Sequence, residues 1–303
     1  MILTVTLNAA LDVTYETGTV AWGGSNRVAA VRERAGGKGV NVARVAAALG
    51  SPVLATGLLG GGTGAQIRAD LDRTATPHDF GAVRGTSRRT LAAVATDSGE
   101  VTVFNEPGPR ITPQEWADFS AHYRALLPPA SVVVLSGSLP PGAPPDAYAE
   151  LAAAATVPVI LDADGDALTR GVAGRPALIK PNAEELARAT GRTDPIAGAR
   201  ALLAAGAGAA LVSLGADGML AVTPDGAWRA APPRPVTGNP TGAGDAAVAA
   251  AARSWGAPWP DLLRDAVALS AAAVAAPVAG EIDADLYRAL RPQITVQGVP
   301  CPS

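Results

Sequence analysis

The chain of 303 residues is poor in the residues that build disulfides and zinc sites. It contains one cysteine, Cys301, and two histidines, His78 and His122. One cysteine excludes an intramolecular disulfide framework, and the whole set excludes a zinc site rich in cysteine and histidine. The two histidines lack the spacing of a metal motif, so we expect them in the core or on the surface. We assign no function to Cys301.

Charge of either sign and aromatic side chains are also scarce. Charged residues make up 17% of the chain, against about 25% in ordinary soluble domains. The net charge of −3 excludes a strongly basic surface, so a nucleic-acid partner is not expected. The longest apolar run, 266–276, is too short to cross a bilayer, and the N-terminus lacks the pattern of a signal peptide. We therefore expect a cytoplasmic protein without a membrane partner.

What the chain does have is an alternation of short apolar segments with longer helical patterns rich in alanine and leucine. The expected strands are 3–7, 53–58, 132–135, 157–161, 178–180 and 211–214. The expected helices are 40–49, 113–126, 146–154, 183–190, 197–205 and 246–254. Several strands are continuously apolar, as is typical of strands covered on both faces. The alternation predicts the α/β class, with a mostly parallel sheet flanked by helices.

Two segments, 13–34 and 88–105, interrupt this alternation with hairpin-like patterns. They predict a small separate antiparallel sheet that serves as a lid. No shift in composition marks a linker, so we expect one domain, 1–303, with the lid inserted. Ligands of open parallel sheets bind beyond the carboxyl ends of the strands, and polar or glycine-rich residues follow five of the predicted strands. These are 8–12, 136–138, 162–164, 180–182 and 213–215.

The strongest motif is the glycine-rich loop 242–244, which leads into Asp245 at the start of a predicted helix. Glycine lets a backbone approach a ligand closely, and the free N–H groups of a helix start attract anions. A carboxylate there can accept the proton of a hydroxyl that attacks phosphorus. An ordinary glycine-rich turn explains the same pattern. A dinucleotide fingerprint ending at Ala247 is less favoured, because the proline-rich segment 232–235 is a poor strand.

A second motif, Gly36-Gly37-Lys38-Gly39, precedes a helix and suits a sugar or a phosphate. It is not a Walker A loop, because Lys38 is followed by glycine. A surface loop with a solvated lysine is the plain alternative. Two lid arginines, Arg88 and Arg89, are likewise consistent with a solvated face. Asp12 either binds sugar hydroxyls or ends the first strand.

A third motif, Lys180-Pro181-Asn182-Ala183-Glu184-Glu185, joins a buried strand to a helix. Asn182 is expected to cap the helix, and Glu185 stands where it would complete a capping box. The functional alternative is that Glu185 holds a metal-bound water beside nucleotide phosphates. The spacing alone does not separate these two roles.

Together these motifs resemble those of PfkB-type carbohydrate kinases of the ribokinase-like superfamily over nearly the whole chain. The matching segments follow the family's order: 4–12, 36–44, 105–109, 135–142, 180–186 and 242–245. The 1-phosphofructokinase and tagatose-6-phosphate kinase branch is the most similar. The resemblance implies a ribokinase-like α/β fold with a β-sheet lid, ATP and Mg²⁺ as cofactors, and a homodimer.

The resemblance also implies a role for each site residue. Asp245 would be the catalytic base, and the backbone of Gly242, Ala243 and Gly244 would form the anion hole. Binding of the sugar is implied for Asp12, Gly37, Lys38, Asn41, Arg88 and Ser136. Of these, Lys38 and Arg88 would clamp the phosphate already on the sugar. The nucleotide site would include Lys180, Asn182, Ser213 and Gly215 together with the loop glycines. Magnesium would be held by Asn182 and, through water, by Glu185.

The chain departs from the 1-phosphofructokinase pattern at several positions. The lid motif usually resembles Thr-Arg-Thr-Asn-Val-Lys, whereas this chain has the residues Ser87-Arg88-Arg89-Thr90-Leu91-Ala92. Pro240 before the catalytic loop is similar to the tagatose-phosphate branch. We expect an ATP-dependent kinase that converts fructose 1-phosphate to fructose 1,6-bisphosphate. Tagatose 6-phosphate, fructose 6-phosphate and free sugars are the alternative substrates. A sugar-phosphate or nucleotide sensor and a nicotinamide oxidoreductase are the alternatives of other classes.

Overall fold

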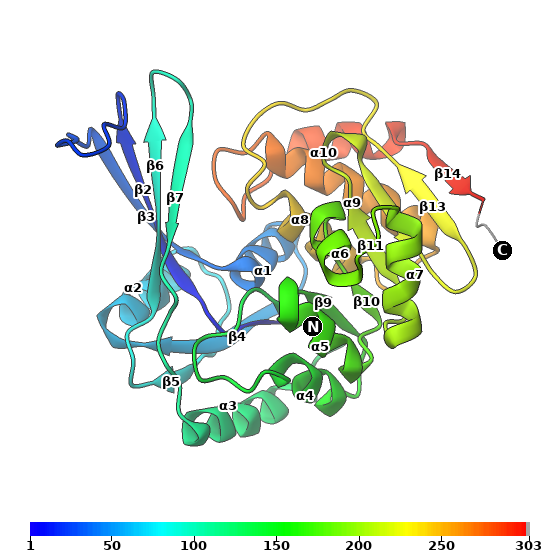
Figure 1. Cartoon of the computed structure of the whole chain (residues 1–303), viewed down its shortest axis with the longest axis horizontal. Coiled ribbons are helices and arrows are strands. Elements are labelled where there is room, and N and C mark those ends of the chain that lie inside the picture. Colours follow the sequence, from blue (N-terminus) through cyan, green and yellow to red (C-terminus); the bar gives the residue numbers. More distant parts are fainter. Residues whose placement is uncertain (301–303) are drawn as a thin grey trace.

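The computed structural model describes residues 1–300, so Cys301 lies outside it, and contains two separate β-sheets (Figure 1). The larger sheet has ten strands in the order β14-β13-β12-β11-β10-β9-β8-β1-β4-β5. Their bounds are β1 Ile2–Thr6, β4 Val53–Gly60, β5 Gly81–Val83, β8 Val132–Ser136, β9 Val159–Asp162, β10 Leu178–Ile179, β11 Ala210–Ser213, β12 Met219–Val222, β13 Ala227–Ala230 and β14 Val296–Val299. Strands β5 to β11 of this order run parallel to their neighbours. The predicted α/β class with a mostly parallel sheet is confirmed.

Helices cover both faces of this sheet, and each face has its own hydrophobic core. The helices are α1 Lys38–Ala48, α2 Gly61–Arg73, α3 Pro113–Leu126, α4 Ala147–Ala154, α5 Gly165–Gly171, α6 Ala183–Thr190, α7 Pro195–Ala205, α8 Ala243–Arg253, α9 Trp259–Val274 and α10 Ala284–Leu290. One core contains side chains of α1, α2, α8 and α9, and the other contains side chains of α3 to α7. Every residue of β1 is buried between them. This double burial is why the central strands are continuously apolar.

Two helices begin and end at the predicted residues because their first turns carry complete caps. In α3, Thr112 accepts a hydrogen bond from the backbone of Glu115, whose side chain bonds back to Thr112, and Pro113 occupies the first helical position. In α6, Asn182 and Glu185 form the same reciprocal arrangement, with both N···O distances 2.8 Å. Such caps satisfy N–H groups that a helix start otherwise leaves free.

The alanine-rich part of the chain forms a tightly packed pair of helices. In α8 all residues from Asp245 to Ala252 are buried, because α1 and α9 pack against it. Helices that are apolar all round are buried in this way. The apolar run 266–276 lies mostly within α9, and among residues 1–300 no helix has the length and hydropathy that a bilayer span requires.

The smaller sheet is the predicted lid, and it stands apart from the main body (Figure 1, upper left). Its order is β3-β2-β6-β7, with bounds β2 Ala10–Thr17, β3 Ala30–Gly36, β6 Arg88–Ala95 and β7 Val101–Asn105. Hairpin pairs β2–β3 and β6–β7 are antiparallel, whereas the central pair β2–β6 is parallel. The lid is therefore mixed rather than purely antiparallel, since two hairpins join side by side in the same direction.

Several elements of the main body were not expected from the sequence, among them α2 and the strands β12 to β14. Helix α2 begins within the run Gly60-Gly61-Gly62, which looks like a loop, yet Ile67 and Leu71 anchor it in the core. Strands β12, β13 and β14 extend the sheet in antiparallel fashion. Strand β14 comes from the C-terminal end of the chain, so its pairing with β13 follows from tertiary structure.

Candidate active site

The carboxyl ends of the parallel strands open into a cleft of about 950 Å³ between the main sheet and the lid. All but one of the predicted site residues line this cleft. They are Asp12, Gly37, Lys38, Asn41, Arg88, Lys180, Asn182, Glu185, Ser213, Gly215, Gly242, Ala243, Gly244 and Asp245. Residues separated by more than 200 positions in the chain thus meet at one sheet edge, as ligand sites in open α/β sheets do.

Ser136 is the predicted substrate-binding residue that does not line the cleft. It ends β8 beside Asp162, is completely buried, and its hydroxyl oxygen has no hydrogen-bond partner in the described structure. A side chain without access to the cleft does not contact a sugar, so its position gives no support for direct substrate binding. His78 and His122 also lie away from the cleft, next to the carbonyl groups of Thr76 and Asp79.

Asp245 lies in the first turn of α8, three residues after the left-handed Gly242 (φ 87°), which caps the helix. A Cβ on Gly242 would come within 2.9 Å of Ala279, so only glycine fits this turn without displacing its neighbour. The Asp245 side chain is 7% exposed and accepts a 2.8 Å hydrogen bond from Asn41 Nδ2. Burial, followed by the nearby charge of Asp162, raises the pKa of Asp245 to about 6. The residue is therefore a carboxylate that can take up a proton near neutral pH.

No strand precedes this loop in the region 231–242. The dinucleotide fingerprint requires a strand immediately before its glycines, with a βαβ unit around them. The structure therefore excludes that alternative for residues 242–247, and with it the main argument for a nicotinamide oxidoreductase.

Two lysines share one buried carboxylate at the centre of the cleft. Lys38 Nζ lies 3.1 Å and Lys180 Nζ lies 3.6 Å from Oδ1 of Asp162, the last residue of β9. Burial raises the pKa of Asp162, but Lys180 and Lys38 together hold it below its usual range. Asp162 in turn raises the pKa of Lys38, so Lys38 is a cation, and both lysines line the cleft. The sequence identified residues 162–164 only as polar residues after a strand, and Asp162 received no role.

The opposite side of the cleft is built from the lid around Asp12. Its carboxylate lies against Gly36 so closely that a Cβ there would come within 1.9 Å of Oδ2. Burial raises the pKa of Asp12 to about 6, against the opposing charge of Arg88 and a hydrogen bond from Thr90. Arg88 donates to the carbonyl oxygen of Asn8 at 3.0 Å and lines the cleft, whereas the neighbouring Arg89 is exposed outside it. A carboxylate beside a cation suits a ligand that carries both hydroxyl groups and an anion.

The remaining wall is apolar and could accommodate a flat ring. It is formed by the start of β12, by the segment after β13 and by one face of α9, none of which the sequence identified as part of a site. The residues on it are Met219, Pro232, Pro235, Val236, Thr237, Gly238, Val267, Ser270, Ala271 and Val274. Such residues carry no chemical motif, so only their common position reveals the wall. Predicted nucleotide residues Ser213 and Gly215 lie at its edge.

This fold and cleft define a kinase that transfers a phosphoryl group to an alcohol. Residues 7–284 match the family model for pfkB family carbohydrate kinases. The chain belongs to this family and has the ribokinase-like fold that the resemblance implied.

Solved structures of similar proteins agree with this assignment. Phosphofructokinase-2 from Escherichia coli, in complex with fructose-6-phosphate, is 30% identical with a TM-score of 0.88, and the match covers 96% of this chain and 98% of that one. A possible 1-phosphofructokinase from Thermotoga maritima is 26% identical with a TM-score of 0.86 over 99% of both chains. Ribokinase from Arabidopsis thaliana, at 22% identity and a TM-score of 0.75 over 96% of this chain and 98% of that one, shares the fold.

Proposed function

We propose that this carbohydrate kinase transfers the γ-phosphoryl group of ATP to a ketohexose phosphate, with fructose 1-phosphate as the favoured substrate. Tagatose 6-phosphate and fructose 6-phosphate are the alternatives. The observation that carries the proposal is that Asp12 and Arg88 of the lid, whose charges interact, line the same cleft as the buried Asp245. The similarity to proteins named as phosphofructokinases supports a phosphorylated sugar as the acceptor. ATP and sugar phosphates are cytoplasmic metabolites, so the proposed reaction belongs in the cytoplasm.

In the proposed mechanism Asp245 accepts the proton of the sugar hydroxyl as its oxygen attacks the γ-phosphorus. A new P–O bond forms to the sugar while the bond to the β-phosphate oxygen breaks, and ADP leaves. The first N–H groups of α8 have no partners within the helix and lie at the cleft, where they would stabilise the developing phosphoryl charge, although the N–H of Ala243 also donates to the carbonyl oxygen of Pro240 at 3.2 Å. Lys38 and Lys180, held by Asp162, add two positive charges to the same region. Asp12 and Arg88 orient the sugar.

The residues at the centre of the cleft fit a magnesium ion. Asp162 Oδ2 is buried without a hydrogen-bond partner, and Glu185 and Asn182 line the cleft beside it. Carboxylate oxygens completed by water are the ligands that Mg²⁺ prefers. We propose that Asn182 and, through water, Glu185 hold the ion, and that Asp162, for which the sequence predicted no role, adds a carboxylate oxygen. When bound, Mg²⁺ would neutralise charge on the nucleotide phosphates.

Replacing Glu185 separates its capping role from a metal role. Glu185→Gln can still complete the capping box with Asn182, so we expect little change in melting temperature. The Mg²⁺ concentration for half-maximal activity should rise roughly tenfold, as for other residues that hold metal-bound water. A magnesium titration of both proteins measures this. If the magnesium dependence is unchanged and Glu185→Ala only lowers the melting temperature, Glu185 is a cap alone.

A panel of acceptors tests the proposed function directly. ADP release would be measured with fructose 1-phosphate, fructose 6-phosphate, tagatose 6-phosphate, free fructose and ribose. We expect the phosphate esters to exceed the free sugars by well over about tenfold in kcat/KM. Equal use of free fructose or ribose would contradict a sugar-phosphate site. Binding of the sugars without any turnover would support a sensor on the same scaffold.

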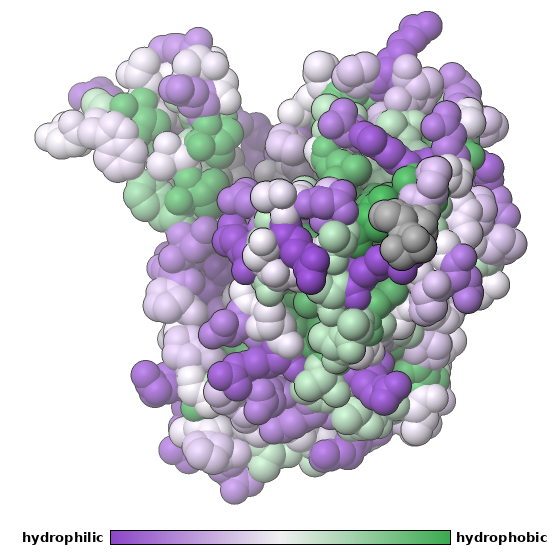
Figure 2. Space-filling view, turned by 45° about the vertical axis from the view of Figure 1, so that its right-hand side comes forward, coloured by the Kyte–Doolittle hydropathy of each residue, from purple (hydrophilic) through white to green (hydrophobic). Residues whose placement is uncertain are grey.

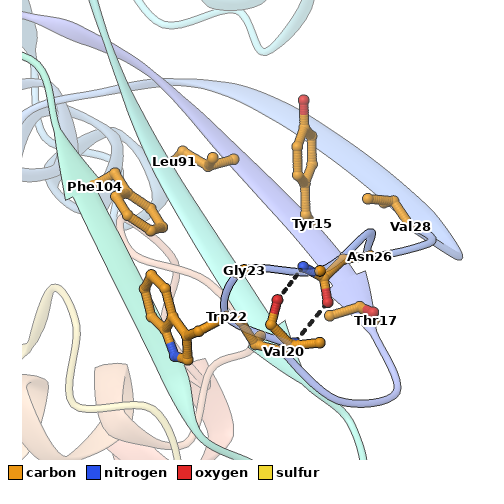
Figure 3. Close-up of a pocket in the computed structure, with 12 residues that line it drawn as sticks. Tyr15, Thr17, Val20, Trp22, Gly23, Asn26, Val28, Leu91 and Phe104 are labelled. Atoms are coloured by element: carbon orange, nitrogen blue, oxygen red, sulfur yellow. Dashed lines mark hydrogen bonds between the residues drawn. The ribbon is translucent and has the colours of Figure 1, made fainter.

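We propose that the lid also forms a homodimer contact. Figure 2 shows apolar side chains gathered on the lid, where Trp22 is 73% and Val31 is 56% exposed. Trp22 and Phe104 lie next to each other, with ring centroids 6.1 Å apart, and both line a pocket of about 290 Å³ that also includes Tyr15 and Leu91 (Figure 3). Large exposed apolar patches mark interaction sites, and a second lid would cover this one. A solution mass of twice 30.2 kDa would agree, and a mass of 30.2 kDa would not.

A further inference from the structure

A buried carboxylate lies behind the sugar side of the cleft without lining it. Asp70 on α2 is 9% exposed. Its Oδ2 accepts a 2.9 Å hydrogen bond from the backbone N–H of Ala35 and another from the guanidinium of Arg44, and its Oδ1 accepts one from Arg73. The N–H of Ala35 and the two guanidinium groups hold the pKa of Asp70 below its usual range in spite of burial. Asp70 is therefore ionised, and it connects β3, α1 and α2 through these three hydrogen bonds.

Asp70 accepts a hydrogen bond from the last part of β3, at Ala35. This strand is at the edge of the lid, so the outward N–H and C=O of Ala35 have no neighbouring strand. Asp70 accepts from the N–H, and Arg44 donates to the carbonyl oxygen at 2.6 Å. Buried backbone groups need such partners, and here the two side chains replace a missing strand.

The position of Ala35 determines the room available to Asp12. Gly36 follows immediately, and the Asp12 carboxylate packs against its backbone. Gly37 follows, with φ 106°, and is the cap residue before α1. A Cβ on Gly37 would come within 2.7 Å of Thr6. Both glycines are closely packed, so a shift of Ala35 would also move the backbone of Gly36 against which the Asp12 carboxylate packs.

Asp70 also balances a buried positive charge that lies close to Asp12. Arg44 is 5% exposed, and Arg34 adds a second positive charge near it. A buried guanidinium without a carboxylate partner is strongly unfavourable. The charge of Arg44 already acts on Asp12, because it opposes part of the rise in the pKa of Asp12 that burial causes. Without Asp70, Arg44 would lose its ion-pair partner, and Asp12 is a carboxylate with which it already interacts.

We propose that Asp70 is a positioning residue for sugar binding. It fixes the Ala35 peptide and occupies the guanidinium of Arg44, which leaves the Asp12 carboxylate in place and free for the hydroxyl groups of the substrate. The inference rests on the proposed role of Asp12 in holding the sugar. It does not depend on which sugar that is.

The test compares Asp70→Asn and Asp70→Ala with the unmodified protein, using whichever acceptor of the panel the unmodified protein phosphorylates. Asn keeps an acceptor for the Ala35 N–H but loses the charge, and Ala loses both. We expect the KM for the sugar to rise roughly tenfold in Asp70→Asn and further in Asp70→Ala, because small displacements of binding groups have effects of this size. The KM for ATP should change less than about twofold.

Asp265→Asn is the matched control. Asp265 is also a buried helical carboxylate, 3% exposed, and is bound by Ser254, Tyr287 and Arg291, but it does not line the cleft. It should lower the melting temperature without a selective change in the sugar KM. The proposal is overturned if Asp70→Asn folds and keeps the sugar KM of the unmodified protein, or if its KM values for sugar and ATP rise together. If the ketohexose-phosphate assignment is wrong, the unmodified protein would instead use free fructose or ribose as well as the phosphate esters in the acceptor panel.

Discussion

Asp245→Asn is expected to lower kcat by about 10²-fold or more, because Asn keeps the size and the contact with Asn41 but cannot accept a proton. The KM for the sugar should change much less, since binding does not require proton transfer. Single-turnover measurements with the preferred acceptor would show the loss in the chemical step. Near-normal turnover in this variant would mean that another group is the base.

The pH profile provides an independent check on Asp245. Its pKa of about 6 predicts that activity rises with pH around this value, because only the ionised carboxylate accepts a proton. Asp12, also with a pKa of about 6, should make the rise in kcat/KM steeper than the rise in kcat. In Asp245→Asn the rise in kcat should be lost.

The raised pKa of Asp245 also determines whether the stability of the fold rises or falls with pH. The folded protein binds the proton of Asp245 more tightly than the unfolded chain, so this group stabilises the fold below about pH 4 and loses that contribution as pH rises through 6. Asp245→Asn should therefore melt at a higher temperature than the unmodified protein at pH 8. A lower melting temperature would point to unfolding as the cause of lost activity.

Arg88→Ala is expected to remove most of the preference for phosphorylated over free sugars. A charge-assisted hydrogen bond to a phosphate contributes about 1.5–3 kcal/mol, so kcat/KM for the ester should fall roughly 10- to 100-fold. Slow activity on free sugar should be spared. Arg88→Lys should recover only part of the preference, because it lacks the planar fork of the guanidinium.

Arg89→Ala is the control for this change. Arg89 is the next residue of β6, carries the same charge, and is exposed outside the cleft. It should leave the ratio of kcat/KM values unchanged. If Arg88→Ala lowers activity on esters and free sugars equally, Arg88 serves to hold the lid through Asn8 rather than to bind the sugar phosphate.

Local signals in the sequence predicted the elements whose ends are determined locally. Helix α3 has the predicted bounds because Thr112, Pro113 and Glu115 satisfy its first turn without help from elsewhere. Helix α2 was missed because its glycine-rich start is intrinsically unfavourable in a helix, and the burial of Ile67 and Leu71 overrides that preference. Strand β14 was missed because its partner, β13, lies more than 60 residues earlier in the chain.

The residues of the candidate site also fall into those that local sequence signals identified and those that only the structure revealed. Gly242 to Asp245 and the lysine loop were found because their residue types are unusual and their spacing suits an anion. Asp162 received no role because a single aspartate after a strand is common, and its two lysine partners come from α1 and the end of β10. Ser136 was assigned to the substrate because it lies at the end of a predicted strand, but a sequence does not show that the residue is completely buried and does not line the cleft.

By itself the sequence determined the α/β alternation, the presence of a lid, the family and most of the polar residues that line the cleft. These depend on composition, periodicity and short motifs, which act over a few residues. Only the tertiary structure decided which charges pair, that Asp245 and Asp12 titrate near pH 6, and that Asp70 supports the lid strand beside Asp12. Those properties come from burial and from contacts between distant segments, because both desolvation and Coulomb energy depend on distance in space and not on distance along the chain.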